Sequence, residues 1–274
     1  MKLIIKTVAT ASVAALLAGS PAFAGEGKTF KDKVIVEETN KWWGASLSTG
    51  YDSLYMFRGV NILRGDQKYG SGLYWTDLNA TWNITENDSI NVGGWQGFGV
   101  SKTDYKEFDL YASYTRTIGD LSLSMGYIFY YVWSAPLYSH ELNWSAAYAI
   151  DLGFVTITPS LTYFLNLGPD TEDKGIAPTA SSYLLPRIDL SFPITDWLSI
   201  DPWTSFGINF GYNANADGDF FNGGNNYEIG IGVPIKINDV IGIYGYVAYS
   251  YQWNDLVGTR PSTFWGGGSV NFSF

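Results

Sequence analysis

The chain has 274 residues, no cysteine and one histidine, and its formal net charge is −10. Nucleic-acid binding is disfavoured because it needs clustered Lys and Arg to neutralise phosphates. Disulfide scaffolds, thiol catalysis and Cys-ligated or His-rich metal sites are excluded by the same composition, and we expect neither a metal nor a cofactor. Charged residues make up 15% of the chain, against about 25% in an average soluble domain.

Residues 1–24 have the pattern of a secretory signal peptide. Lys2 and Lys6 provide a positively charged start, 7–19 is small and apolar, and Ala22-Phe23-Ala24 fits an A-x-A cleavage site. The apolar run is shorter than the ~20 residues that a spanning helix needs. We expect export with cleavage after Ala24. The remaining charge would be 14 − 26 = −12, because two of the 16 basic residues are lost.

Residues 25–42 are rich in charge and lack the alternation that follows them. We interpret them as a solvated periplasmic tail, with a small plug folded into a barrel lumen as the alternative.

From residue 44 onward, apolar and polar residues alternate with a period of two, which is typical of strands with two unlike faces. Most expected strands are far longer than the ~5–6 residues of soluble strands and long enough to cross a membrane at a tilt. The twelve expected strands cover 44–58, 72–84, 90–100, 106–117, 121–133, 140–150, 154–165, 183–193, 198–212, 227–237, 241–253 and 263–274.

The links between these strands alternate in length. Links such as 118–120 and 151–153 are short, whereas 59–71, 166–182 and 213–226 are longer and rich in Gly, Asn and Asp. This asymmetry is typical of bacterial outer-membrane barrels. The predicted fold class is therefore all-β: a transmembrane, antiparallel, up-and-down barrel of 12 strands over 43–274. Because the loops are short, we expect neither a large constriction loop nor an elaborate receptor.

The apolar face of a membrane barrel points to lipid, so outer-membrane lipid and lipopolysaccharide are the expected surroundings, with aromatic side chains at both interfaces. The aromatic residues expected near the loop rim are Tyr55, Phe57, Phe98, Trp133, Phe210, Tyr212, Tyr227, Tyr251, Trp253 and Phe264. Those expected near the turn rim are Trp82, Tyr114, Tyr148, Trp197, Phe272 and Phe274. The final strand closes on Phe274 and resembles the C-terminal signal that the bacterial barrel assembly machinery recognises, which makes that machinery an expected partner.

The opposite face of the strands points to the lumen. Its charged members are eight acids and three bases, the candidate pore-lining residues: Asp52, Arg58, Asp77, Glu107, Asp109, Glu141, Arg187, Asp189, Asp201, Glu228 and Lys236. An excess of one sign of charge favours counter-ions in a pore. The sequence thus predicts a non-enzymatic, porin-like channel for passive diffusion of small polar solutes or cations, with weak cation preference.

Three alternatives remain open. The carboxylates could pair with Arg58, Arg187 and Lys236 and brace a filled barrel with a structural or adhesive role. The same alternation would also fit a secreted β-sandwich with its apolar face inward. A lipid-modifying hydrolase would have to use His140, but no serine stands two residues after it.

Aromatic residues also share the inward parity, and they would either stack on sugars or bases or simply fill a narrow lumen. They are Trp75, Trp95, Tyr111, Tyr130, Trp203, Tyr244, Tyr246 and Trp265.

One loop has a partial calcium-binding pattern. Asn213, Asn215, Asp217 and Asp219 match the first half of an EF-hand loop, but Gly224 occupies the position where a bidentate Glu is needed. We expect no metal site there.

The segment Gly50-Tyr51-Asp52-Ser53-Leu54-Tyr55-Met56-Phe57-Arg58-Gly59-Val60 resembles the end of the first strand in the TorF-type family of porins, with similarity over roughly 44–100. The resemblance implies an outer-membrane barrel with a porin-like role and indicates no substrate. Within that motif Phe57, Arg58 and Gly59 carry over. We expect Arg58 at the loop rim, within reach of Asp52 or Asp77, and Gly59 at the turn into the first loop.

Overall fold

The computed structural model describes residues 42–63, 72–100, 104–134, 137–169, 179–215, 217–253 and 262–274. The expected signal peptide, and almost all of the segment 25–42 that we interpret as a periplasmic tail, lie outside these ranges. No helix in the described part of the chain is long and apolar enough to cross a membrane.

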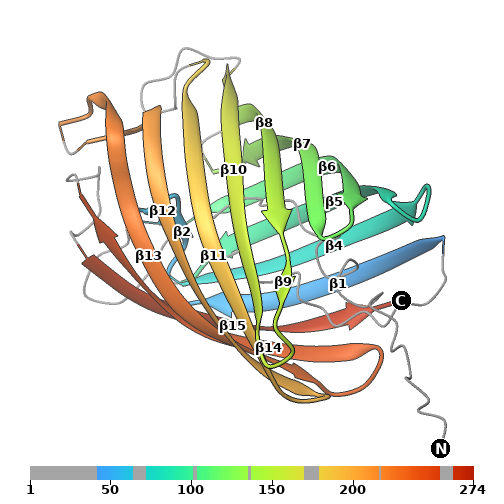
Figure 1. The fold of residues 1–274 in the computed structure, drawn as a ribbon. Helices are drawn as coiled ribbons and strands as arrows, with labels where there is room; N and C mark the ends of the chain where they lie inside the picture. The colour runs from blue at the N-terminus through green and yellow to red at the C-terminus, as the bar shows by residue number, and fades with distance from the viewer. Residues whose placement is uncertain are drawn as a thin grey trace, which may run out of the picture.

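A closed antiparallel barrel of twelve long strands forms the molecule (Figure 1). Each strand pairs with the next along the chain, β15 pairs with β1, and the β10–β11 pair completes the ring. Phe274 continues the closing seam, because its N–H donates to Ala45 O at 2.9 Å. The barrel strands are β1 (Trp43–Asp52), β4 (Leu73–Asn83), β5 (Asp88–Gly99), β6 (Lys106–Ile118), β7 (Leu121–Val132), β8 (Leu137–Tyr148), β10 (Thr156–Pro169), β11 (Ser182–Thr195), β12 (Leu198–Ala214), β13 (Phe220–Lys236), β14 (Ile241–Gln252) and β15 (Ser262–Ser273). The twelve-strand prediction is confirmed.

Burial follows the predicted alternation. Along β6, Glu107, Asp109 and Tyr111 are buried, whereas Leu110 and Ala112 between and after them are exposed. The exposed side is apolar all round the ring, with Leu78, Leu123 and Ile188 among its members. Side chains therefore point alternately to the lumen and to the outside, as the period of two requires.

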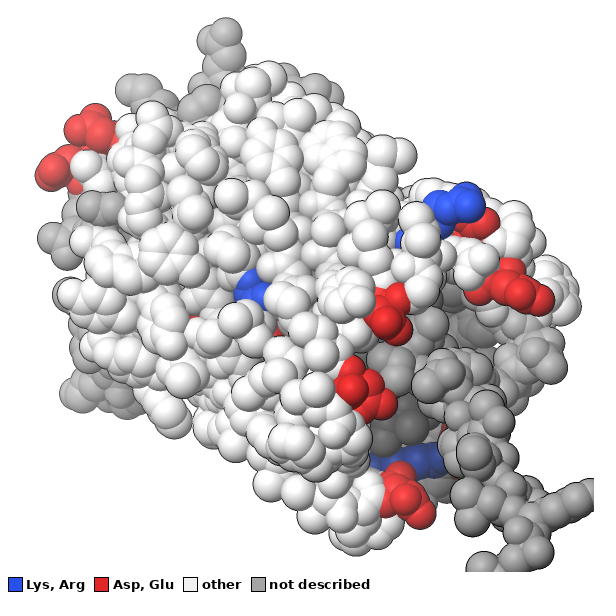
Figure 2. Space-filling model, in the orientation of Figure 1, with Lys and Arg blue, Asp and Glu red and all other residues white. Residues whose placement is uncertain are grey.

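The outer surface has the composition expected of a lipid-facing wall. The face shown in Figure 2 is almost free of charge over the strands, and most charged side chains gather toward its two ends. Apolar side chains on the outside of a barrel are unfavourable in water, but they carry no such free-energy cost when lipid surrounds them.

The first expected strand, 44–58, is wrong at its end. The wall strand β1 stops at Asp52, and the chain then turns into the barrel as a small hairpin of β2 (Met56–Phe57) and β3 (Val60–Asn61). We call residues 53–63 the lumen hairpin. Tyr55 and Phe57 continue the alternation of β1 in sequence, but they pack against a buried cluster inside instead of facing the rim.

Tyr212 is a second correction. Gly211 has a φ of +72°, and the pairing of β12 with β13 shifts register between Phe210 and Ala214. The side-chain Oδ1 of Asn209 accepts hydrogen bonds from the N–H groups of Tyr212 and Asn213 at 2.9 and 2.8 Å. This irregularity interrupts the alternation, so Tyr212 turns inward rather than to the interface.

Candidate functional site

The lumen hairpin turns through two residues with left-handed backbone. Arg58 has a φ of +49° and Gly59 a φ of +78°, and Phe57 pairs with Val60 across them. Positive φ at both central residues is the signature of a type I′ hairpin turn, in which glycine is at ease and arginine is strained. Gly59 therefore does permit the turn, as expected. A Cβ atom at Gly59 would also lie 2.8 Å from Asn226 Cγ.

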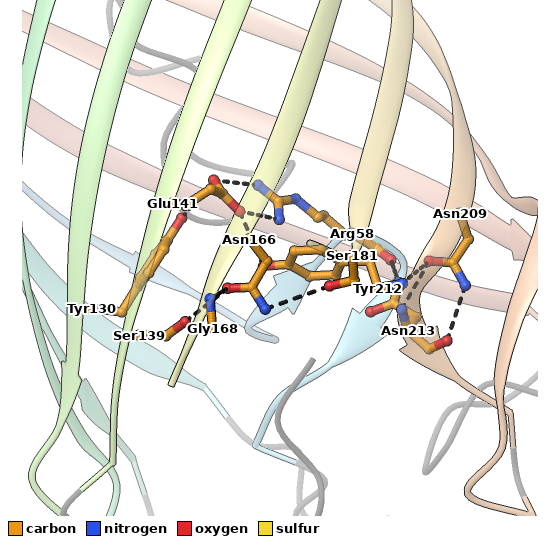
Figure 3. A network of polar contacts seen from close by, with 10 residues as sticks. All are labelled: Arg58, Tyr130, Ser139, Glu141, Asn166, Gly168, Ser181, Asn209, Tyr212 and Asn213. Atoms are coloured by element: carbon orange, nitrogen blue, oxygen red, sulfur yellow. Dashed lines mark hydrogen bonds and ion pairs between the residues drawn. The ribbon is translucent and has the colours of Figure 1, made fainter. Parts of the chain in front are cut away.

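Arg58 does not stay at the rim beside Asp52 or Asp77, as the sequence suggested, but reaches across the interior to Glu141 on β8 (Figure 3). Its Nη1 donates to Glu141 Oε2 at 2.6 Å and its Nη2 to Oε1 at 2.8 Å. Both side chains are buried, with 4% and 1% exposure. This is the two-pronged geometry in which a guanidinium matches a carboxylate best.

Aromatic rings surround the same guanidinium. We call these four rings the Arg58 cage. The Cζ atom of Arg58 lies 4.0 Å from the ring centroid of Phe164, 4.4 Å from that of Tyr212, 4.6 Å from that of Phe57 and 5.5 Å from that of Tyr183. Rings at this range attract a cation through their negative faces, most strongly where water is excluded. The Tyr212 hydroxyl also donates to Glu141 Oε2 at 3.2 Å.

The backbone of the turn is held from the opposite wall. The carbonyl oxygen of Arg58 accepts hydrogen bonds from the side-chain amides of Asn225 at 2.8 Å and Asn213 at 3.0 Å. The carbonyl oxygen of Gly59 accepts one from Gln252 Nε2 at 3.0 Å. These amides come from β12, β13 and β14, so the hairpin tip is fixed both to that wall and, through Arg58, to β8.

The two faces of the lumen hairpin pack on two different aromatic clusters. Tyr55 joins the cluster that includes Trp75 and Trp95, and its hydroxyl donates to Glu107 Oε2 at 2.7 Å. Met56 packs into a second cluster with Trp203 and Trp265 on the other side. The hairpin thus lies across the lumen near the loop end of the barrel, an inserted segment that the sequence expectation of no large constriction loop did not include.

Several of the inward aromatic residues lie against the wall over glycines that make room for their rings. Trp75 is paired across strands with Gly50, Tyr111 with Gly93, and a Cβ atom on either glycine would overlap the ring. Trp203 has the same relation to Gly230. We call these pairs the glycine-seated aromatics. All the inward aromatics that the sequence indicated are buried, and they pack with the lumen hairpin or with one another.

Most of the other candidate pore-lining residues have side-chain polar partners. Asp52 accepts from the Tyr246 hydroxyl, Asp77 from Tyr111, Asp201 from Ser191 and Glu228 from Trp203 Nε1, while Arg187 pairs with Asp189 and Lys236 with Asp239. Asp109 is buried to 1% exposure beside them in β6. Asp77, Asp189 and Lys236 are only partly buried. Arg58, Glu107 and Glu141 beside the hairpin are therefore engaged, and the partly exposed charges lie farther toward the turn end.

Sequence reasoning missed Phe164, Tyr183, Asn213 and Asn225 as parts of this site. The available signal was the Arg58-Gly59 pair, which fits a two-residue hairpin turn directly after a strand. The partners of that turn come from strands far away in the sequence, and no local pattern identifies them.

The structure places two further features that the sequence singled out, His140 and the loop near residue 215. His140 lies on the outer face, hydrogen-bonded through Nδ1 to the Tyr127 hydroxyl and close to Phe129. Asn213 is turned inward to Arg58, and Asn215 Oδ1 accepts from the backbone of Asp219. Within the described ranges, no group of three or more His, Asp and Glu side chains could hold a metal ion.

No family model and no curated protein matches the chain. Among solved structures, it is similar to an outer-membrane channel from Pseudomonas putida F1, with a TM-score of 0.57 and 9% identity over 87% of this chain and 100% of that chain. It is also similar to the KdgM porin, with a TM-score of 0.50 and 9% identity over 84% of this chain and 99% of that chain. The fold is that of bacterial outer-membrane barrels. At this identity the likeness establishes the fold alone.

Proposed function

We propose that this protein is an outer-membrane channel for passive diffusion of small polar solutes, weakly cation-preferring, whose lumen is narrowed near its loop end by residues 53–63. The observation that carries the proposal is a polar-lined barrel with one inserted hairpin held by side chains. The hairpin is a tethered element of the first loop, so it can limit passage without being part of the wall. The fold shared with known channels and the expected signal peptide support the location.

The excess of acids supports the cation preference. Eight inward acids face three inward bases, and the acids that remain partly exposed include Asp77 and Asp189. Such charges attract cations over roughly 10 Å at 0.1 M salt but only about 3 Å at 1 M. Preference should therefore be strongest in dilute salt.

We expect the double variant Asp77→Asn with Asp189→Asn to lose most of this preference. It removes two negative charges and leaves Arg187 without the carboxylate that it contacts at 2.8 Å. The measurement is the reversal potential of reconstituted protein in planar bilayers under a KCl gradient. Asp196→Asn, in an exposed turn, is the matched control and should leave the potential unchanged. Anion preference of the wild-type protein would contradict the charge argument.

A second candidate function is a structural or adhesive barrel with a filled lumen. The buried contacts of Arg58 favour this function, because a lumen hairpin that is held on several sides resists displacement. It predicts bilayers that stay silent when correctly folded wild-type protein is inserted, whereas the channel proposal predicts discrete conductance steps.

We also propose that the chain belongs with the TorF-type porins. The segment that supports the resemblance, Gly50–Val60, includes the turn of the lumen hairpin. The shared Phe57, Arg58 and Gly59 are therefore residues with a three-dimensional role here rather than parts of a simple strand end.

Assembly offers a separate test through Phe274. This residue closes the seam with Ala45, and we propose that the barrel assembly machinery recognises it. Phe274→Asp should sharply lower the amount of protein in the outer membrane, while Phe274→Tyr should retain most of it. Quantitative fractionation with heat-modifiability on gels measures both. Equal amounts of wild type and Phe274→Asp would contradict the proposed role.

A further inference from the structure

The Arg58 cage has the construction of a ligand site that already contains its ligand group. A buried carboxylate presents both oxygens to one guanidinium, and rings from three wall strands and from the hairpin itself enclose it. Phe164 belongs to β10, Tyr183 to β11 and Tyr212 to β12, so most of the enclosure is built into the wall. Only Phe57 and Arg58 arrive with the hairpin.

From this we propose that Glu141, with Phe164, Tyr183 and Tyr212, forms a binding site for solutes that carry a guanidinium group, and that Arg58 occupies this site as a tethered competitor. The inference deepens the proposed function, on which it rests, by naming a class of cation that the channel would recognise. Figure 3 shows the arrangement: the Arg58 guanidinium meets Glu141, to which the Tyr130 hydroxyl also donates, and the Arg58 backbone meets Asn213 on the other side.

Three features favour guanidinium over other cations. Two oxygens of Glu141 are engaged in parallel, which a planar fork satisfies and a spherical ammonium does not. Flat rings lie at 4.0 and 4.4 Å from the guanidinium carbon, within stacking range. The hydroxyls of Tyr130 and Tyr212 both donate to Glu141 at 3.2 Å, so the carboxylate is held in position from the wall even without the hairpin.

Tethering explains why Arg58 competes well for this site. A group attached to the same chain has a high local concentration, in the millimolar range for flexible tethers. The concentration of free solute must exceed this local concentration of Arg58. The strained left-handed backbone of Arg58 helps the solute, because the strain is relieved when Arg58 leaves the site. A solute that binds the Glu141 carboxylate in place of Arg58 would remove the link between the hairpin tip and β8, while the Tyr55 contact with Glu107 and the amides of the opposite wall would still hold the hairpin.

The test is binding of methylguanidinium to folded full-length protein in detergent, by isothermal titration calorimetry. Arg58→Ala should bind it at millimolar or lower concentration, and more tightly than wild type does. Arg58→Ala with Glu141→Gln should bind roughly tenfold more weakly or worse, because a hydrogen-bonded charge is lost. Urea, which has a similar planar shape but no charge, should not bind either variant, and tetramethylammonium should bind Arg58→Ala more weakly than methylguanidinium.

Equal binding by Arg58→Ala and the double variant, or no binding by either, would overturn the site. If Arg58→Ala does not fold alone, refolding with methylguanidinium replaces the titration: rescue that urea does not reproduce supports the site, and failure of rescue overturns it. Conductance is measured separately. A silent wild-type bilayer together with Glu141-dependent binding would reject the channel and keep the site, whereas conductance without binding would do the reverse.

Discussion

A barrel in which Met56–Asn61 is replaced by Gly-Gly is expected to conduct at least several-fold better than wild type. The hydrogen bond from Ile62 N–H to Tyr55 O, at 2.9 Å, already brings the ends of this segment together, so the shortened link needs no rearrangement of the wall. The change removes Phe57 and Arg58 with the turn, and with them the bridge between β8 and the opposite strands. Small-ion current through planar bilayers is the measurement.

Folding of this variant is checked by heat-modifiability and circular dichroism. Asp217→Gly, at an exposed loop tip on the same rim, is the matched control and should conduct like wild type. A well-folded variant with unchanged conductance would show that residues 53–63 do not limit the passage of ions.

The second large effect concerns the stability of the Arg58–Glu141 pair. Arg58→Met leaves Glu141 buried without its partner, and Glu141→Gln leaves the guanidinium without its counter-charge. Breaking a buried pair by removing one member typically costs about 3–5 kcal/mol. The double variant Arg58→Met with Glu141→Gln should cost clearly less than the sum of the two single changes. Reversible urea unfolding in lipid vesicles gives the four free energies of this cycle.

Lys236 and Asp239 provide the matched control pair. Their side chains meet at 2.8 Å, but Asp239 is 76% exposed. An exposed pair of this kind is worth less than about 1 kcal/mol, so Asp239→Asn should change the free energy of unfolding little. Additive effects at Arg58 and Glu141 would mean that the pair contributes no coupling.

The barrel was predictable because its determinants are local. Alternation fixes which side of each strand meets lipid, as along Leu121–Val132, and strand number and closure follow from repeating it. The interior site was not predictable in the same way. Tyr55 and Phe57 keep the alternating pattern after the wall strand has ended, so the pattern does not distinguish a continuing strand from a hairpin that leaves the wall.

Pairing partners posed the other difficulty. The candidate pore-lining acids nearest to Arg58 in sequence are Asp52 and Asp77, yet the pair forms with Glu141, 83 positions away. Which inward carboxylate it meets depends on the direction in which the turn enters the barrel, a property of three dimensions. The prediction for Tyr212 was wrong for a more local reason. The left-handed glycine before it, Gly211, reverses the side to which the Tyr212 side chain points.

The glycine-seated aromatics imply that the bore of this barrel is encoded in its small residues rather than in its strand count. Each ring rests in the space that a missing Cβ leaves, and a methyl group at Gly93 or Gly230 would lift the ring of Tyr111 or Trp203 toward the axis. Twelve strands fix the circumference of the wall. The free width inside the wall then depends on whether single Cβ atoms are present beside the rings. The high glycine content and the high aromatic content of this chain therefore have one common structural cause.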